Sequence, residues 1–163
     1  MSLKNQLGLS SLSPLPYPLK NVEEGFIFET EFGTTYAIRF TNDAGYVSES
    51  SFAHAIFSFS ITPIAGLVKQ KDPRVEQTVI RAILLTFEAL PDAVINYVCS
   101  LDNDQQIARS RLFHRWYHKA GATQFVKLDF TDHENRIYTS VLFRNNHPAE
   151  EEIRNRFTES FDK

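Results

Sequence analysis

The segment from Asp72 to Leu90 constrains the fold most, because it carries a long helical pattern with a defined start and end. Asp72 is a favourable N-cap residue, Pro73 suits the first helical position, and Pro91 lies just beyond the last turn. Apolar side chains recur at helical spacing around most of the circumference, so the polar face is narrow. We therefore predict a helix that is buried against a sheet.

Strand patterns precede this helix. Segment 26–40, FIFETEFGTTYAIRF, holds two runs rich in Phe, Ile, Thr and Tyr around Gly33, which is typical of a β-hairpin. Segment 55–62, AIFSFSIT, alternates apolar and hydroxyl side chains and predicts a third strand. One hypothesis makes this third strand an edge strand, with Phe57 and Phe59 as a contact surface for a partner.

A central strand and a second helix are predicted after the first helix. Segment 93–101, AVINYVCSL, is apolar and rich in β-branched residues with little alternation, which is typical of a strand covered on both faces. The second helix follows, with Asn103 or Asp104 as its N-cap and Gly121 at its end. Strand, helix and strand thus alternate through the middle of the chain.

The C-terminal part is predicted to form a second hairpin and a last helix. Strand patterns at 124–130 and 136–143 flank the polar turn TDHEN, and the last helix follows Pro148. The predicted order is β-β-β-α-β-α-β-β-α, which is an α+β fold with a single mixed sheet. The prolines near the N-terminus suggest an extended arm at residues 1–21, and we expect residues 22–163 to form one domain.

Charge and cysteine content narrow the classes of partner and the compartment. The formal net charge of -3 provides no general attraction to nucleic acid or to an anionic membrane, so we expect neither as a partner. No apolar run is long enough for a signal peptide or a membrane span. Cys99 is the only cysteine, so an intrachain disulfide is excluded, and it lies in an apolar strand pattern. We therefore expect a soluble, cytoplasmic protein.

The second predicted helix is amphipathic and places its cationic side chains on one side. Arg111, His114, Arg115 and His118 follow one another at helical spacing, and we call these four residues the basic ridge. The basic ridge is a candidate anion-binding site, although a solvated helix surface explains the same pattern. His114 and His118 lack a third ligand and the glutamate of the HExxH motif, so we predict no metal site.

Four segments carry a first family resemblance: FETEFGTTYAIRF, DPRVEQTVIRAIL, PDAVINYVCSLD and ARSRLFHRWYHKAG. Together they resemble a family of small uncharacterised bacterial proteins that is known only as a domain of unknown function. The resemblance covers most of the chain from Gly25 onward. It implies no activity.

The order of elements also resembles the N-acetyltransferase (GNAT) superfamily without its first strand and helices. In that superfamily a motif of the type LYxKxGF follows the central strand, and residues 116–122, WYHKAGA, are similar to it. The resemblance implies that Tyr117 acts as a general acid toward the leaving thiolate. The superfamily binds the coenzyme A pyrophosphate with a glycine-containing loop, whereas the matching segment 69–78, KQKDPRVEQT, has no glycine. The loop is therefore degenerate, although Lys69, Lys71 and Arg74 supply some positive charge there.

Two functional hypotheses follow. The first is a non-catalytic, cytoplasmic binding or interaction module of an uncharacterised bacterial family, with the basic ridge as contact surface and no cofactor. Its partner would be an unknown protein or small molecule. The alternative is an acyl-CoA-dependent N-acyltransferase with a degenerate pyrophosphate loop, which would use acetyl-CoA as cofactor and Tyr117 as catalytic residue.

Overall fold

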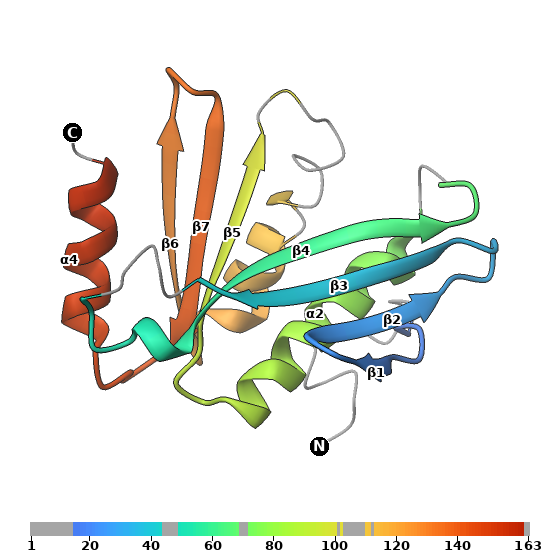
Figure 1. Ribbon diagram of the computed structural model, residues 1–163, viewed down its shortest axis with the longest axis horizontal. Coiled ribbons are helices and arrows are strands. Elements are labelled where there is room, and N and C mark those ends of the chain that lie inside the picture. Colours follow the sequence, from blue (N-terminus) through green and yellow to red (C-terminus); the bar gives the residue numbers. More distant parts are fainter. Residues whose placement is uncertain are drawn as a thin grey trace.

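The computed structural model describes residues 15–43, 49–68, 72–100, 102, 110–111 and 113–161 (Figure 1). These residues form one mixed sheet with helices on both of its faces, so the predicted α+β class is confirmed. The N-terminal strands are β1 (Lys20–Val22), β2 (Gly25–Glu29), β3 (Thr35–Asn42) and β4 (Ile56–Ala65). The remaining strands are β5 (Val94–Ser100), β6 (Phe125–Asp132) and β7 (Ile137–Arg144). The helical elements are η2 (Ala53–Ala55), α2 (Pro73–Ala89), η3 (Tyr117–Gly121) and α4 (Glu150–Phe161).

The predicted order of strands and helices is confirmed, and one short strand is added before it. The seven strands lie in the order β1-β2-β3-β4-β5-β7-β6, and every neighbouring pair is antiparallel except β4 and β5. The helix α2 connects these two parallel strands, as a parallel pair requires. The hypothesis of an edge strand with Phe57 and Phe59 is wrong, because the chain returns through α2 and places β5 beside β4.

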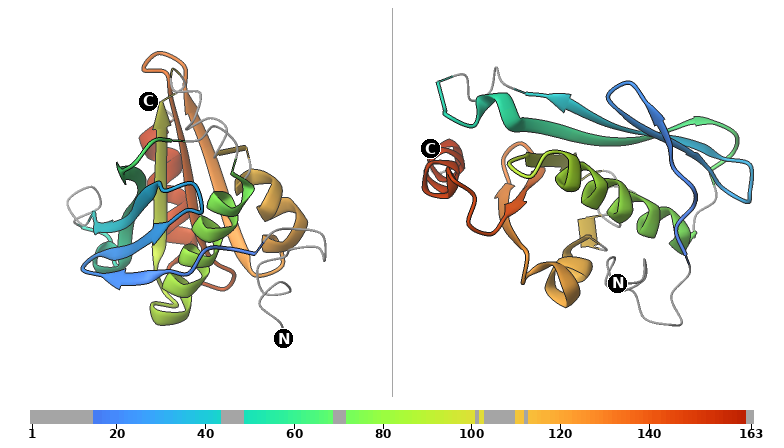
Figure 2. Two further views of the ribbon diagram at one scale, coloured as in Figure 1. Left: turned by 90° about the vertical axis from the view of Figure 1, so that its right-hand side faces the viewer. Right: turned by 90° about the horizontal axis from the view of Figure 1, so that it is seen from below.

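The parallel pair β4 and β5 holds together only near its start. Three register pairs join the two strands, from Ile56 with Val94 to Ser58 with Asn96, and beyond these pairs β4 and β5 diverge (Figure 1). The antiparallel half β1–β4 therefore crosses the half β5–β7 at a steep angle. The space between the two diverging strands is filled by side chains, and α2 lies beneath it (Figure 2).

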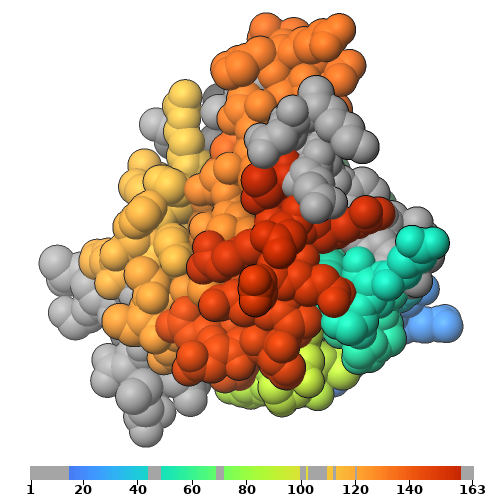
Figure 3. Space-filling model, turned by 90° about the vertical axis from the view of Figure 1, so that its left-hand side faces the viewer, coloured from blue at the N-terminus to red at the C-terminus, as the bar shows by residue number. Residues whose placement is uncertain are grey.

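The two faces of the sheet carry separate cores. We call the face with Ile95 and Tyr97 the front face; its core includes Ile80 and Phe87 of α2 and extends to Trp116. The back-face core is smaller and is closed by α4, which occupies the centre of that side of the molecule in Figure 3. The prediction that β5 is a central strand is confirmed, since it lies between β4 and β7.

Part of the predicted N-terminal arm packs on the start of α2. The Tyr17 side chain is 4% exposed, and its hydroxyl donates to Asp72 Oδ2 at 2.7 Å. The Arg74 guanidinium lies 3.8 Å from the centre of the Tyr17 ring, and Arg74 Nε donates to the Leu15 carbonyl at 2.9 Å. The first 14 residues of the arm lie outside the described residues.

The second predicted helix is described only in part. Residues 110–111 and 113–116 are helical and continue into the π-helical turn η3, which ends at Gly121 as predicted. A Cβ atom at Gly121 would lie 3.1 Å from the Trp116 ring, which explains the glycine. The proposed caps Asn103 and Asp104 lie outside the described residues. None of the helices that the structure describes has the length and apolar character needed to cross a membrane.

Candidate functional site

The basic ridge borders a hollow on the front face of the sheet. The helical residues Ser110, Arg111, His114 and Arg115 form one wall, and the floor comes from β5, β6 and β7. The volume of about 560 Å³ lies within the range of small-molecule sites, roughly 300–1,000 Å³. We call this feature the ridge hollow; its lining residues are Cys99, Ser110, Arg111, His114, Arg115, Asp129 and Tyr138.

A network of polar side chains forms the floor of the ridge hollow. Strand pairing sets Asp129 directly opposite Ser140, and Lys127 lies two residues before Asp129 on the same face of β6. Lys127 Nζ, in a side chain that is 1% exposed, donates to Asp129 Oδ1. The same Oδ1 atom accepts hydrogen bonds from Tyr138 at 2.6 Å and from Ser140 at 2.9 Å. We call Lys127, Asp129, Tyr138 and Ser140 the floor cluster.

The floor cluster keeps Asp129 charged and Tyr138 neutral. Burial tends to raise the pKa of the Asp129 carboxyl, but the hydrogen bonds from Lys127 and Tyr138 outweigh it and lower the pKa below its ordinary value. Burial and the hydrogen bond to Asp129 raise the pKa of Tyr138 far above its ordinary value. The negative charge of Asp129 is therefore matched by Lys127, and the cluster carries no net charge.

His114 connects the floor cluster to the basic ridge. Its Nδ1 atom lies 3.2 Å from Lys127 Nζ and 3.8 Å from Asp129 Oδ2. Because an ammonium group only donates, Nδ1 accepts from Lys127 and the proton of the neutral ring is on Nε2. Burial, and then the charges of Lys127 and His118, lower the pKa of His114 below its ordinary value. The imidazole is thus favoured in its neutral form.

The structure brings three of the four ridge residues to the ridge hollow. Arg111, His114 and Arg115 line it, whereas His118 lies beside His114 with 4.3 Å between the ring centres. Both arginines are exposed, and among the described residues no carboxylate lies within 4 Å of either guanidinium group. Positive charge is therefore available at the rim of the ridge hollow.

Tyr117, the candidate general acid, lies outside the ridge hollow. Its hydroxyl donates to the backbone oxygen of Phe125 at 3.1 Å, and this hydrogen bond joins η3 to β6. The start of α2 is likewise occupied by the chain itself, because the Asp72 side chain accepts from Arg74 N at 3.1 Å. Lys69 and Lys71 lie outside the described residues. Neither Tyr117 nor the start of α2 lines the ridge hollow.

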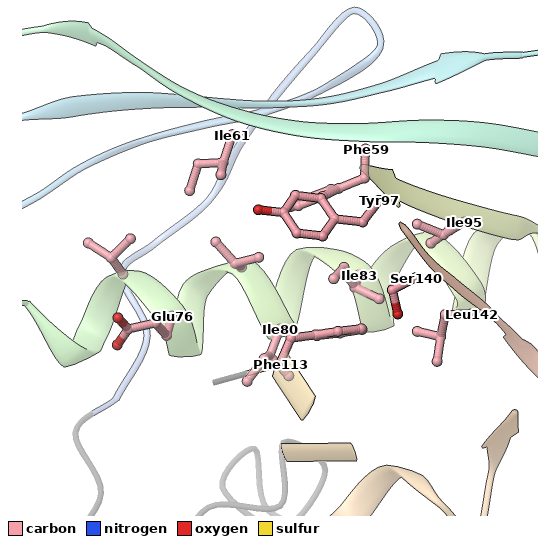
Figure 4. A pocket seen from close by; sticks show the side chains of 12 residues that line it. Phe59, Ile61, Glu76, Ile80, Ile83, Ile95, Tyr97, Phe113, Ser140 and Leu142 are labelled. Carbon is pink, nitrogen blue, oxygen red and sulfur yellow. The ribbon is translucent and has the colours of Figure 1, made fainter. Parts of the chain in front are cut away.

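A small apolar cavity lies beside the ridge hollow, between α2 and the diverging strands β4 and β5. Figure 4 shows Phe59 and Tyr97 on the sheet side of the cavity and Ile80 and Ile83 on α2. The volume of about 40 Å³ has room for only a few water molecules, at roughly 10–15 Å³ for each. Phe113 contributes the wall nearest the basic ridge.

Cysteine and metal chemistry find little support in the described part of the chain. Cys99 is buried, and burial raises the pKa of its thiol although a backbone hydrogen bond from Tyr138 opposes this. A buried, protonated thiol is a poor nucleophile. No group of three or more His, Cys, Asp or Glu side chains that could hold a metal ion occurs among the residues described.

Sequence reasoning missed the floor cluster. The strand patterns at 124–130 and 136–143 contain Lys127, Asp129 and Tyr138 but assign them no role beyond the hairpin. A signal was present, because two opposite charges at alternate positions of an otherwise apolar strand must share one face of the sheet. The residues that face Lys127 and Asp129 on β7 depend on the register of the two strands, and the hydrophobic pattern of the sequence does not define that register.

Part of the chain matches a known protein family. Residues 71–159 match the Family of unknown function (DUF6169). This range contains α2, the basic ridge, the floor cluster and most of α4. No curated protein and no solved structure matches the chain.

Proposed function

The chain belongs to the Family of unknown function (DUF6169), and we propose a function for it from the geometry of the site, because the family has no assigned activity. We propose that the protein is a non-catalytic binding module that holds a small anionic molecule in the ridge hollow. The observation that carries this proposal is the pair of exposed arginines, Arg111 and Arg115, on the rim of a hollow of ligand size.

Charge supports an anionic ligand. An arginine guanidinium offers several N–H donors in one plane and binds carboxylate or phosphate oxygens with two hydrogen bonds at once. Asp129 is the carboxylate among the lining residues, and its charge is matched by Lys127. With His114 neutral, Arg111 and Arg115 leave the ridge hollow with a positive charge.

The hydrogen bonds of the floor cluster support binding over catalysis. Tyr138 and Ser140 both donate to Asp129, and Lys127 bridges Asp129 and His114. Each of these groups that could move a proton is already held by a neighbour. A general base needs a pKa near the working pH, whereas the pKa of Asp129 is lowered and that of Tyr138 is raised.

The acyltransferase alternative stays a prediction with a separate test. It needs acetyl-CoA at the start of α2 and a proton from Tyr117, while Tyr117 donates to Phe125 and the start of α2 is capped by Asp72. These contacts favour the binding module. The module's setting is proposed to be the bacterial cytoplasm, which suits a single, buried, free thiol at Cys99.

The experiment is a calorimetric titration of the full chain with inorganic phosphate, benzoate and acetyl-CoA, each at low and at high salt. We expect phosphate or benzoate to bind, and we expect the variant with both Arg111→Gln and Arg115→Gln to bind at least tenfold more weakly. The matched control is Arg39→Gln, an exposed arginine on β3, which should bind like the wild type. Equal affinity in the double variant and the control would refute the proposal, and tight binding of acetyl-CoA alone would favour the transferase.

A further inference from the structure

The apolar cavity and the ridge hollow share a wall. Ser140 lines the cavity and donates to Asp129, which lines the ridge hollow. Along β5, Tyr97 lines the cavity, and Cys99, two residues further on the same face, lines the ridge hollow. The two spaces are therefore neighbours on one face of the sheet, with polar groups at one end and apolar groups at the other.

The cavity is apolar because the strands diverge above α2. Phe59 of β4 and Tyr97 of β5 contact each other across the widening gap, with 5.5 Å between ring centres. Below them, Val79, Ile80 and Ile83 present aliphatic side chains from α2. An apolar chain in this space would exchange water for aliphatic and aromatic contacts, which is favourable in proportion to the area buried.

Phe113 belongs to the helical segment that carries the basic ridge, and its side chain forms one wall of the cavity. It lines the cavity, and the next residue, His114, lines the ridge hollow. The Phe113 side chain is only half-buried and stacks on Trp116, with 5.4 Å between ring centres. Since the cavity has room for only a few water molecules, an alkyl chain of several carbons needs Phe113 to turn away from it.

Building on the proposed function, we propose that the ligand is an amphipathic anion with an unbranched apolar chain. Its carboxylate or phosphate group lies in the ridge hollow near Arg111 and Arg115. Its chain passes Phe113 into the cavity between α2, β4 and β5. The anionic group of the ligand is attracted to the two arginines and orients the ligand, and the alkyl chain of the ligand supplies most of the affinity.

The test is a series of alkyl carboxylates: acetate, butanoate, hexanoate and octanoate. Trp116 is the only tryptophan of the chain and stacks on Phe113, so its fluorescence reports the movement of Phe113. We expect affinity to rise about threefold to fourfold for each methylene group that becomes buried, until the cavity is full. Octyl phosphate is titrated beside octanoate, so that the preferred head group is identified.

Two variants change the cavity from different sides. Val79→Phe fills it from α2 and should bring the affinities of butanoate, hexanoate and octanoate down toward that of acetate. Phe113→Ala opens it and should increase the ratio of octanoate affinity to acetate affinity several-fold. The matched control is Val126→Phe, at a half-buried position that packs against the back-face core. The control should retain the chain-length dependence of the wild type.

The outcomes separate this inference from the proposed function. If short and long carboxylates bind equally and both depend on the two rim arginines, the ridge hollow binds anions but the cavity takes no chain, and the inference is wrong. If no carboxylate or phosphate binds, the proposed function is wrong as well. Chain-length dependence that survives Val79→Phe also overturns the inference, because the chain would then lie elsewhere.

Discussion

Replacement of Lys127 by methionine should destabilise the protein through Asp129. The Lys127 side chain is 1% exposed, and methionine keeps its length while removing the charge and the donors. Asp129 would keep its hydrogen bonds from Tyr138 and Ser140 but lose the matching positive charge. The variant is thus left with a partly buried carboxylate whose charge is unbalanced.

The structure sets the size of this effect. Breaking a fully buried ion pair by removing one partner costs about 3–5 kcal/mol. The Asp129 side chain is 33% exposed and retains two hydroxyl donors, so water and these donors recover part of the loss. We therefore expect a loss of about 2 kcal/mol in the free energy of unfolding, which lowers Tm by about 4–8 °C in a domain of this size.

The assay is a urea titration followed by Trp116 fluorescence, applied to a double-mutant cycle. Lys127→Met, Asp129→Asn and the variant with both changes are compared with the wild type. We expect a coupling energy of about 1–2 kcal/mol, because the two residues share one hydrogen-bond network. Lys119→Met, at an exposed position of η3, is the control and should shift stability by less than about 0.5 kcal/mol. Additive effects of the two changes would refute the argument that the pair is coupled.

Three further predictions test other parts of the structure. His147 is buried, with Nε2 2.7 Å from the Asp92 oxygen and Nδ1 accepting from Ala149 N, so His147→Ala should cost about 2 kcal/mol in thermal or urea unfolding while His54→Ala, at an exposed position, should cost almost nothing. Tyr17→Phe removes a hydrogen bond to Asp72 and should cost about 1 kcal/mol; an unchanged Tm would show that the N-terminal segment is not held there. The lowered pKa of His114 means that the folded protein resists protonation of this ring more than the unfolded chain does, so its contribution to stability is complete above the ordinary pKa of about 6.5 and is lost as pH falls through the folded pKa. His114→Gln should therefore flatten the fall in stability between about pH 7 and pH 5, and an unaltered pH profile would contradict this assignment.

The sequence predicted the fold well where one local pattern determined an element. The cap at Asp72 and the proline after it define the start of α2, and the observed cap is the Asp72 side chain. The strand β1 was missed, because its three residues are all exposed and carry no alternation. The position of β4 was also misjudged, because neighbours in a sheet follow from a crossover connection and not from the pattern within one strand.

The candidate site was predictable only along the helix. Regular spacing was enough to place Arg111, His114 and Arg115 on one side of it. The floor cluster depends on residues that are far apart in the chain and meet through strand register, as Asp129 and Ser140 do. A single sequence does not define that register, so the partners of His114 could not be foreseen.

The most direct test of the central claim is an amide NMR titration of the full chain with octanoate. We expect the largest shifts at the helical residues Arg111 and Arg115, in the floor-cluster strands β6 and β7, and at Tyr97. These shifts should vanish in the variant with both Arg111→Gln and Arg115→Gln. Shifts centred on the start of α2 near Asp72, or shifts that persist in that variant, would contradict the assignment of the ridge hollow as the binding site.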